Sequence, residues 1–199
     1  MRVWIMLLGM MLMASAAGAA DIAGKWGLSA GLGNGATEIS LIRGHSASTA
    51  WILDARIDQF EASTEVSSSF PGSPPTTATV NNNRGTVSLG PRLRRYTHPE
   101  SDFSPYWDVF LHGEYAKFHD ASFVRRDFEQ IGADLGFSIG AEYFTRWHCS
   151  VAAHSGLFDV RYARIKGTQT GFLGNESSKG HVQSASLVFA PQLFLRTYF

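Results

Sequence analysis

The sequence predicts an all-β fold, in which eight antiparallel strands close into an up-and-down transmembrane β-barrel. Three observations support this. Apolar and polar residues alternate along eight segments, as they do in strands with one face toward lipid and the other toward a polar interior. The last of these segments ends the chain on an aromatic residue, Phe199. Short and long connections also alternate between the segments, as is typical of barrels with one short-turned and one long-looped end.

The first twenty residues are predicted to be a cleaved secretory signal. Arg2 supplies a positive charge, residues 3–13 are apolar, and the small residues 15–20 offer cleavage sites. This apolar run is well short of the roughly 20 residues that a transmembrane helix needs, and no further long apolar run follows Asp21. A membrane location would therefore require a barrel. We divide the chain into a signal peptide, residues 1–20, and one barrel domain, residues 21–199.

The composition excludes several functional classes. The formal net charge is zero, so no basic surface for nucleic acid is indicated. Cys149 is the only cysteine, which rules out an internal disulfide, and no His/Cys cluster has the spacing of a zinc site. No cofactor or metal is expected.

The strands are predicted from where the alternation begins and ends. The clearest runs from Ile131 to Tyr143, where apolar residues alternate with glycine, serine and acidic residues. In the seventh strand the alternation changes phase near Gly156, which indicates a β-bulge. Pro91 weakens the prediction of the fourth strand, because proline has no N–H group to donate to a neighbouring strand. The predicted strands are residues 26–32, 37–43, 50–60, 86–96, 106–118, 131–143, 148–164 and 187–199.

The connections fall into two classes. Turns near His45, Pro99 and Arg146 are assigned to the periplasmic side. Residues 63–84 are rich in Ser, Thr, Pro and Asn and have no periodicity, and residues 166–182 contain four glycines. These two segments and residues 119–130 are predicted to be external loops. The turn at residues 33–35, Gly-Asn-Gly, would be an unusually short external loop. Five aromatic residues near strand ends are expected to form interfacial girdles: Trp26, Trp51, Trp107, Tyr143 and Phe199.

The signal, the eight strands, the Gly-Ala-Glu-Tyr-Phe run at residues 140–144 and the terminal Phe199 resemble small outer-membrane β-barrel proteins, the porin-like family related to the membrane domain of outer membrane protein A. The resemblance covers residues 24–199 and consists mostly of pattern. It implies a bacterial outer-membrane location, contact with outer-membrane lipids, and folding by the barrel-assembly machinery. The machinery would recognise the terminal strand, with Phe199, Leu195 and Leu193 as the assembly signal. Thr197 stands where many members have another hydrophobic residue.

The inward faces of the predicted strands carry charges of both signs. The interior of an eight-stranded barrel is just wide enough for side chains to fill. These charges are therefore expected to pair across a plugged lumen, and a narrow pore is the alternative. The predicted network comprises Asp54, Arg56, Asp58, Arg92, Arg94, Glu114, Asp134, Glu142 and Arg196.

The expected function is that of a monomeric, non-enzymatic structural or surface protein. One alternative is adhesion or host interaction, with a surface ligand bound through residues 63–84 and 166–182. Another is a lipid A-modifying enzyme that uses His154, Ser155 and Asp159. Adjacent strand residues point to opposite faces, however, and the His-x-Ser-Asn run of lipid A deacylases is absent.

A soluble, lipocalin-like barrel is the architectural alternative. It would also have eight strands and a signal peptide, but its apolar faces would point inward and its charges outward. Alternation by itself does not distinguish the two faces.

Overall fold

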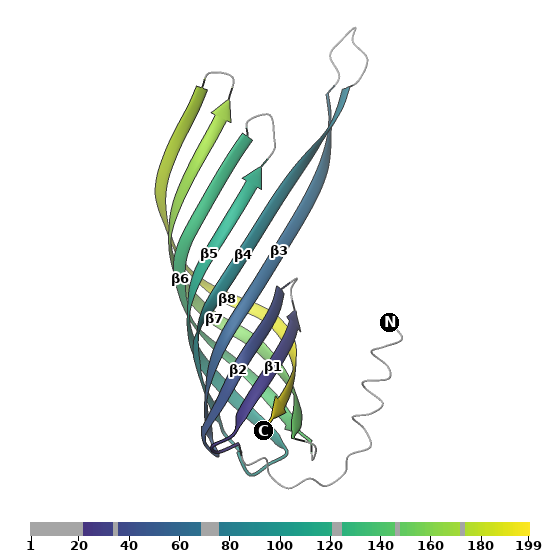
Figure 1. The fold of residues 1–199 in the computed structure, drawn as a ribbon, viewed down its shortest axis with the longest axis vertical. Helices are drawn as coiled ribbons and strands as arrows, with labels where there is room; N and C mark the ends of the chain where they lie inside the picture. The colour runs from purple at the N-terminus through teal and green to yellow at the C-terminus, as the bar shows by residue number, and fades with distance from the viewer. Residues whose placement is uncertain (1–21, 34–35, 69–75, 121–124, 146–147, 172–173) are drawn as a thin grey trace.

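The computed structural model describes residues 22–33, 36–68, 76–120, 125–145, 148–171 and 174–199. Each strand pairs antiparallel with its neighbour in sequence, and β1 also pairs with β8, so the sheet is a closed barrel in the order β1 to β8 (Figure 1). This confirms the predicted fold class. The strands are β1 (Trp26–Gly33), β2 (Ala36–Ser46), β3 (Thr49–Ser68), β4 (Thr76–Tyr96), β5 (Phe103–Asp120), β6 (Arg125–Phe144), β7 (Cys149–Gly171) and β8 (Gly174–Tyr198). The described residues include no helix long and apolar enough to cross a membrane.

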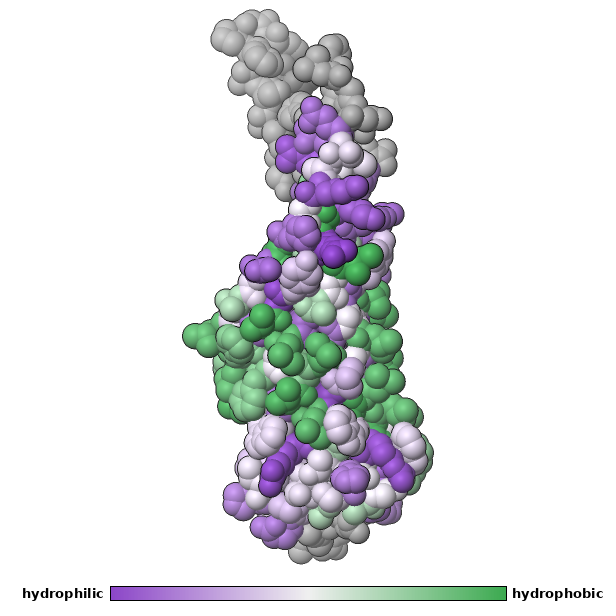
Figure 2. Space-filling model, turned by 90° about the vertical axis from the view of Figure 1, so that its left-hand side faces the viewer, coloured by the Kyte–Doolittle hydropathy of each residue, from purple (hydrophilic) through white to green (hydrophobic). Residues whose placement is uncertain are grey.

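The two faces of the strands point as predicted for a membrane barrel. On β6, Leu135 and Ile139 are exposed on the outside, whereas Ser138 and Glu142 are fully buried inside. Figure 2 shows that the outward residues form a hydrophobic band between two hydrophilic ends. Because the apolar faces lie outside and the charges inside, the lipocalin-like alternative is wrong.

Much of each segment predicted as a long external loop is strand. β3 continues to Ser68 and β4 begins at Thr76, β6 begins at Arg125, and β7 and β8 extend to Gly171 and from Gly174. These extensions are strongly polar, so the backbone ladder continues there without the apolar alternation that reveals a strand in sequence. Residues 69–75, 121–124 and 172–173 lie outside the described residues. The predicted turn at residues 97–105 is also shorter, since β5 begins at Phe103.

Two predicted irregularities occur where expected. The register of β7 against both neighbours shifts between Gly156 and Phe158, which confirms the bulge. In β4, the paired positions with β5 pass from Leu89 directly to Arg92, because Pro91 between them has no N–H to donate.

The turn end of the barrel, where the C-terminus lies (Figure 1), is closed by apolar packing. Ile22, which precedes β1, is only 2% exposed and belongs to a buried cluster with Ile42, Tyr96, Phe144 and Tyr198. The chain lies so close to β2 that a side chain at Gly44 would meet the Ile22 carbonyl. The residues just before the first strand therefore cover this end of the interior.

The barrel wall is much lower on one side. β1 has 8 residues and β2 has 11, whereas the other strands have 18 to 25. Pairing between β1 and β8 stops at Leu32 and Leu193, and pairing between β2 and β3 stops at Ala36 and Asp58. Beyond these points, residues 59–68 of β3 and 174–192 of β8 pair on one side only. We call the gap between these two free edges the lateral opening; in Figure 1 the six longer strands rise past the β1–β2 hairpin.

Candidate functional site

The lower interior of the barrel is organised around the carboxylate of Glu142, which is fully buried. The hydroxyls of Tyr96 and Tyr198 each donate to one of its oxygens at 2.7 Å, and Arg94 Nη1 donates at 3.2 Å. Five donors from β4, β7 and β8 converge on this one carboxylate: Arg94, Tyr96, Ser150, Arg196 and Tyr198. Such charge-assisted hydrogen bonds are about twice as strong as neutral ones.

Arg94 connects Glu142 to a second carboxylate. Its Nε and Nη2 donate to the two oxygens of Asp108 at 2.8 and 2.9 Å, a bidentate pair. Its guanidinium carbon also lies 3.7 Å from the centre of the Tyr106 ring, a cation–π contact. Arg94, Asp108 and Glu142 all have 0% exposure, so solvent reaches none of them from either end of the barrel.

A second group of charges lies around Arg92. Its Nε is 2.6 Å from Asp54 Oδ2, and its Nη2 donates to Glu38 Oε1 at 3.2 Å. His112 Nε2 is 3.4 Å from the same Asp54 oxygen. Arg92 Nη1 is 3.5 Å from Asp108 Oδ2, so the two groups form one continuous network across the lumen.

The structure brings together five of the nine charges predicted from sequence: Asp54, Arg92, Arg94, Glu142 and Arg196. Asp134 lies at the edge of this network, with Oδ2 3.9 Å from Nδ1 of His112, and Glu114 forms a separate ion pair with Arg161. Within the described part of the chain, neither Arg56 nor Asp58 is in an ion pair.

Sequence reasoning missed the three neutral donors to Glu142, which are Tyr96, Ser150 and Tyr198. Tyr96 follows the inward-facing Arg92 and Arg94 at two-residue spacing, and Tyr198 follows Arg196 in the same way. Because side chains alternate between the two faces of a strand, this spacing indicates that both tyrosines face inward.

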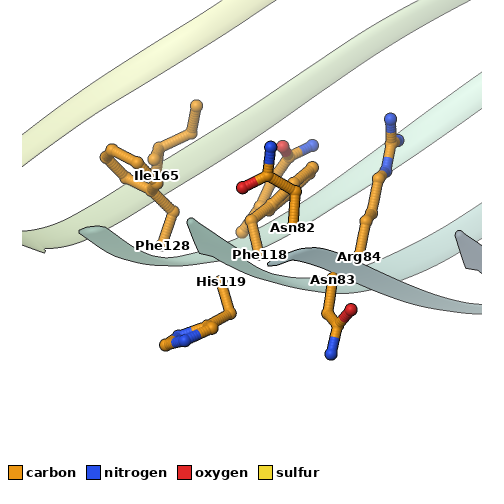
Figure 3. A pocket seen from close by; sticks show the side chains of 8 residues that line it. Asn82, Asn83, Arg84, Phe118, His119, Phe128 and Ile165 are labelled. Carbon is orange, nitrogen blue, oxygen red and sulfur yellow. The ribbon is translucent and has the colours of Figure 1, made fainter. Parts of the chain in front are cut away.

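Farther along the strands, away from the turn end, the concave inner face forms a cavity of about 570 Å³. We call it the inner cup. Its side chains come from β4, β5, β6 and β7 and include Asn82, Arg84, Phe118, Phe128, Gln130 and Ile165. Figure 3 shows the labelled members of this set pointing to one side of the sheet, while Asn83 and His119 point to the other.

The inner cup combines an apolar surface with cationic groups. The guanidinium of Arg84 lies 4.8 Å from the centre of the Phe118 ring. Arg161 forms an ion pair with Glu114, and with the Gln130 amide oxygen turned toward it, Arg161 Nη2 also donates to Gln130 at 2.8 Å. Arg161 is thus satisfied, whereas no carboxylate of the described residues pairs with Arg84.

The groups considered for catalysis do not form a triad in the structure. His154 is buried in the interior with Nδ1 at 3.5 Å from Asp108 Oδ2, and its ring stacks on Tyr106. The Ser155 hydroxyl donates instead to the Gly156 carbonyl at 3.1 Å, and Asp159 accepts from Ser186 at 2.5 Å. The described residues contain no group of three or more His, Cys, Asp or Glu placed to hold a metal ion.

The three residues of the predicted assembly signal lie on the outer surface of the terminal strand. Leu193, Leu195 and Phe199 are all exposed. The backbone of Phe199 is paired with Trp26, with N–H···O distances of 3.0 and 2.8 Å in the two directions. The end of the chain therefore completes the seam that closes the barrel.

The fold is similar to that of a known outer-membrane protein. No family model matches the sequence, and no curated protein matches it either. Among solved structures, the chain is similar to a major outer membrane protein from Thermus thermophilus, with a TM-score of 0.53 and 12% sequence identity. The match covers 88% of this chain and 98% of that chain. At this identity, the comparison shows that the chain has the fold of an outer-membrane β-barrel.

Proposed function

We propose that this chain is an integral protein of the bacterial outer membrane, with a polar interior that is closed to through-flow and a structural or surface role. The observation that carries the proposal is the fully buried network of Arg94, Asp108 and Glu142 inside a wall whose outer face is apolar. Interior charges that pair with one another fill the lumen and do not need water as a partner, so we expect no continuous water-filled channel. The apolar band outside matches what a bilayer requires.

The proposal includes an export and assembly route. Residues 1–20 act as the secretory signal, although they lie outside the described residues. The exposed terminal strand, with Leu193, Leu195 and Phe199, presents the signal to the barrel-assembly machinery. The folded protein works as a monomer surrounded by outer-membrane lipids.

We expect the protein in outer-membrane extracts to migrate as a compact band on unheated gels and as a slower band after heating. Purified protein in planar bilayers is expected to show no steady conductance, because the buried network fills the lumen. Overexpression should leave the mass spectrum of lipid A unchanged. A protein recovered only from the soluble periplasmic fraction would contradict the location, and stable single-channel steps would contradict the closed interior.

A surface-interaction function is the second candidate, and the free edges of β3 and β8 favour it. Unpaired edges can accept an extended segment of a partner as an added strand. Shortening the β3–β4 hairpin beyond residues 59 and 85 would remove much of one edge. Loss of cell or matrix binding in that variant, with its heat-modifiable band intact, would support this role, and unchanged binding would contradict it.

A further inference from the structure

The lateral opening begins inside the hydrophobic band. Leu193 is the last residue of β8 paired with β1, yet Phe189 and Leu187 continue the apolar outer face beyond it. These two side chains are 83% and 89% exposed, against 54% for Leu193, because they have no neighbouring strand on that side. The 8 residues of β1 rise about 20 Å when tilted by roughly 40°, short of the ~25 Å apolar band. One part of the band is thus open at the edge of β8.

The interior is accessible from the side above this point. Gln192 and Phe194, which face inward below the opening, are buried, whereas the inward-facing Val182 is 39% exposed. A side chain added at Gly180, on the same inward face, would find open space. A molecule in the bilayer that passes the edge of β8 would therefore meet the concave inner face of the sheet.

The inner cup on that face has the chemistry of a site for an anionic amphiphile. Phe118, Phe128 and Ile165 provide an apolar surface, and its volume is typical of a pocket for one small ligand. Arg84 lies at the same cavity, stacked on Phe118 and without a carboxylate partner among the described residues. Lipid tails suit the apolar wall, and a carboxylate would pair with the guanidinium.

We propose that the inner cup binds one long-chain fatty acid anion that enters from the bilayer through the lateral opening, with its carboxylate on Arg84 and its chain against Phe118, Phe128 and Ile165. The proposal rests on the proposed membrane location. It adds a ligand to a protein that otherwise has a structural or surface role.

The test uses cis-parinaric acid, a fluorescent long-chain fatty acid, preloaded into nanodiscs that contain the full mature protein. We expect saturable binding of the acid and weaker binding of its methyl ester. Arg84→Gln should weaken binding of the acid about tenfold and remove the preference over the ester, as expected for the loss of one charge-assisted pair. Phe128→Ala should weaken acid and ester alike.

Two control variants change exposed residues on the outer face of the strands that carry Arg84 and Phe128. Arg95→Gln removes a guanidinium from the same strand as Arg84, and Glu129→Ala truncates the chain neighbour of Phe128; both residues are exposed. Neither should change binding. Equal affinity in all variants, or binding only when the probe is supplied from water, would overturn the proposal. The proposal would also be overturned if sedimentation showed a dimer and this dimer did not bind the probe.

The failure of this proposal is distinguishable from the failure of the proposed function. Heat-modifiable mobility and bilayer conductance are measured on the same preparations. A folded, non-conducting protein that fails to bind parinaric acid overturns only the ligand site. A protein that stays in the soluble fraction overturns the membrane function itself.

Discussion

Replacing Glu142 with glutamine is expected to lower the free energy of unfolding by roughly 3–5 kcal/mol, the range found when one partner of a buried ion pair is removed. Arg94 keeps its bidentate pair with Asp108 in this variant. Arg196 has no such second carboxylate within the described residues, since its remaining hydrogen bond goes to the Ser29 hydroxyl at 3.3 Å. The cost therefore comes mainly from leaving the Arg196 charge buried and unpaired.

This stability is measured by urea unfolding of the protein in lipid vesicles, followed by tryptophan fluorescence. Glu129→Gln on the same strand is the matched control, because Glu129 is exposed on the outer face. A change within about 0.5 kcal/mol is expected there. Equal losses in the two variants would show that the Glu142 network does not stabilise the fold.

The double variant Glu142→Gln, Arg196→Gln separates an unpaired charge from a general packing defect. Removing both charges should restore part of the lost free energy of unfolding, since replacing a complete buried ion pair often changes stability little. The two residues are in contact, so a coupling of roughly 0.5–3 kcal/mol is expected. Simple additivity would contradict the assignment of the loss to Arg196.

The sequence predicts strands well only where the two faces of the sheet meet different surroundings. Between Ile131 and Tyr143 the outer face is apolar and the inner face is polar, so every second residue is apolar and the strand is recognisable. At the end of β7 and the start of β8, residues 166–171 and 174–181, both faces consist mainly of polar residues and glycine, and the pairing rests on backbone hydrogen bonds that the types of side chain do not reveal.

The inward position of a charged residue is predictable from sequence, but its partners are not. The period-2 rule places Arg94, Glu142 and Arg196 on inward faces. Which carboxylate each arginine reaches depends on the stagger and tilt of the closed barrel, which no local pattern encodes. Arg94 meets Asp108 directly across from it on β5, whereas Arg196 reaches from β8 past β7 to Glu142 on β6.

The inner cup is not predictable from sequence for a related reason. Phe128 falls within residues 119–130, which have no alternation and are predicted to be a loop, although the structure places it in β6. The lateral opening does leave a signal, because the Gly-Asn-Gly turn at residues 33–35 directly follows the short alternating segment 26–32, which predicts a short first hairpin. A turn that ends a hairpin this early fixes the height of the barrel wall at β1 and β2.

Valine at Gly31 is expected to lower the free energy of unfolding by roughly 1–3 kcal/mol, because it would overpack the seam that closes the barrel. Gly31 lies opposite Phe194, and a side chain there would run into the aromatic ring. The ring is nearly fully buried with the Arg196 guanidinium 5.2 Å from its centre, so it has little room to move. The β1–β8 seam pairs only residues 26–32 with 193–199, which leaves few contacts to absorb the strain.

Gly180→Val is the matched control for Gly31→Val, since Gly180 also faces inward but borders the lateral opening and has no atoms near its added side chain. Valine suits a strand better than glycine, so Gly180→Val is expected to be neutral or slightly stabilising. Urea midpoints and the temperature at which the compact gel band disappears measure both variants. A destabilised Gly180→Val would mean that the wall beside β8 is occupied. A stable Gly31→Val would mean that Phe194 does not fill the seam. The pair of variants thus compares the closed and open parts of the same barrel.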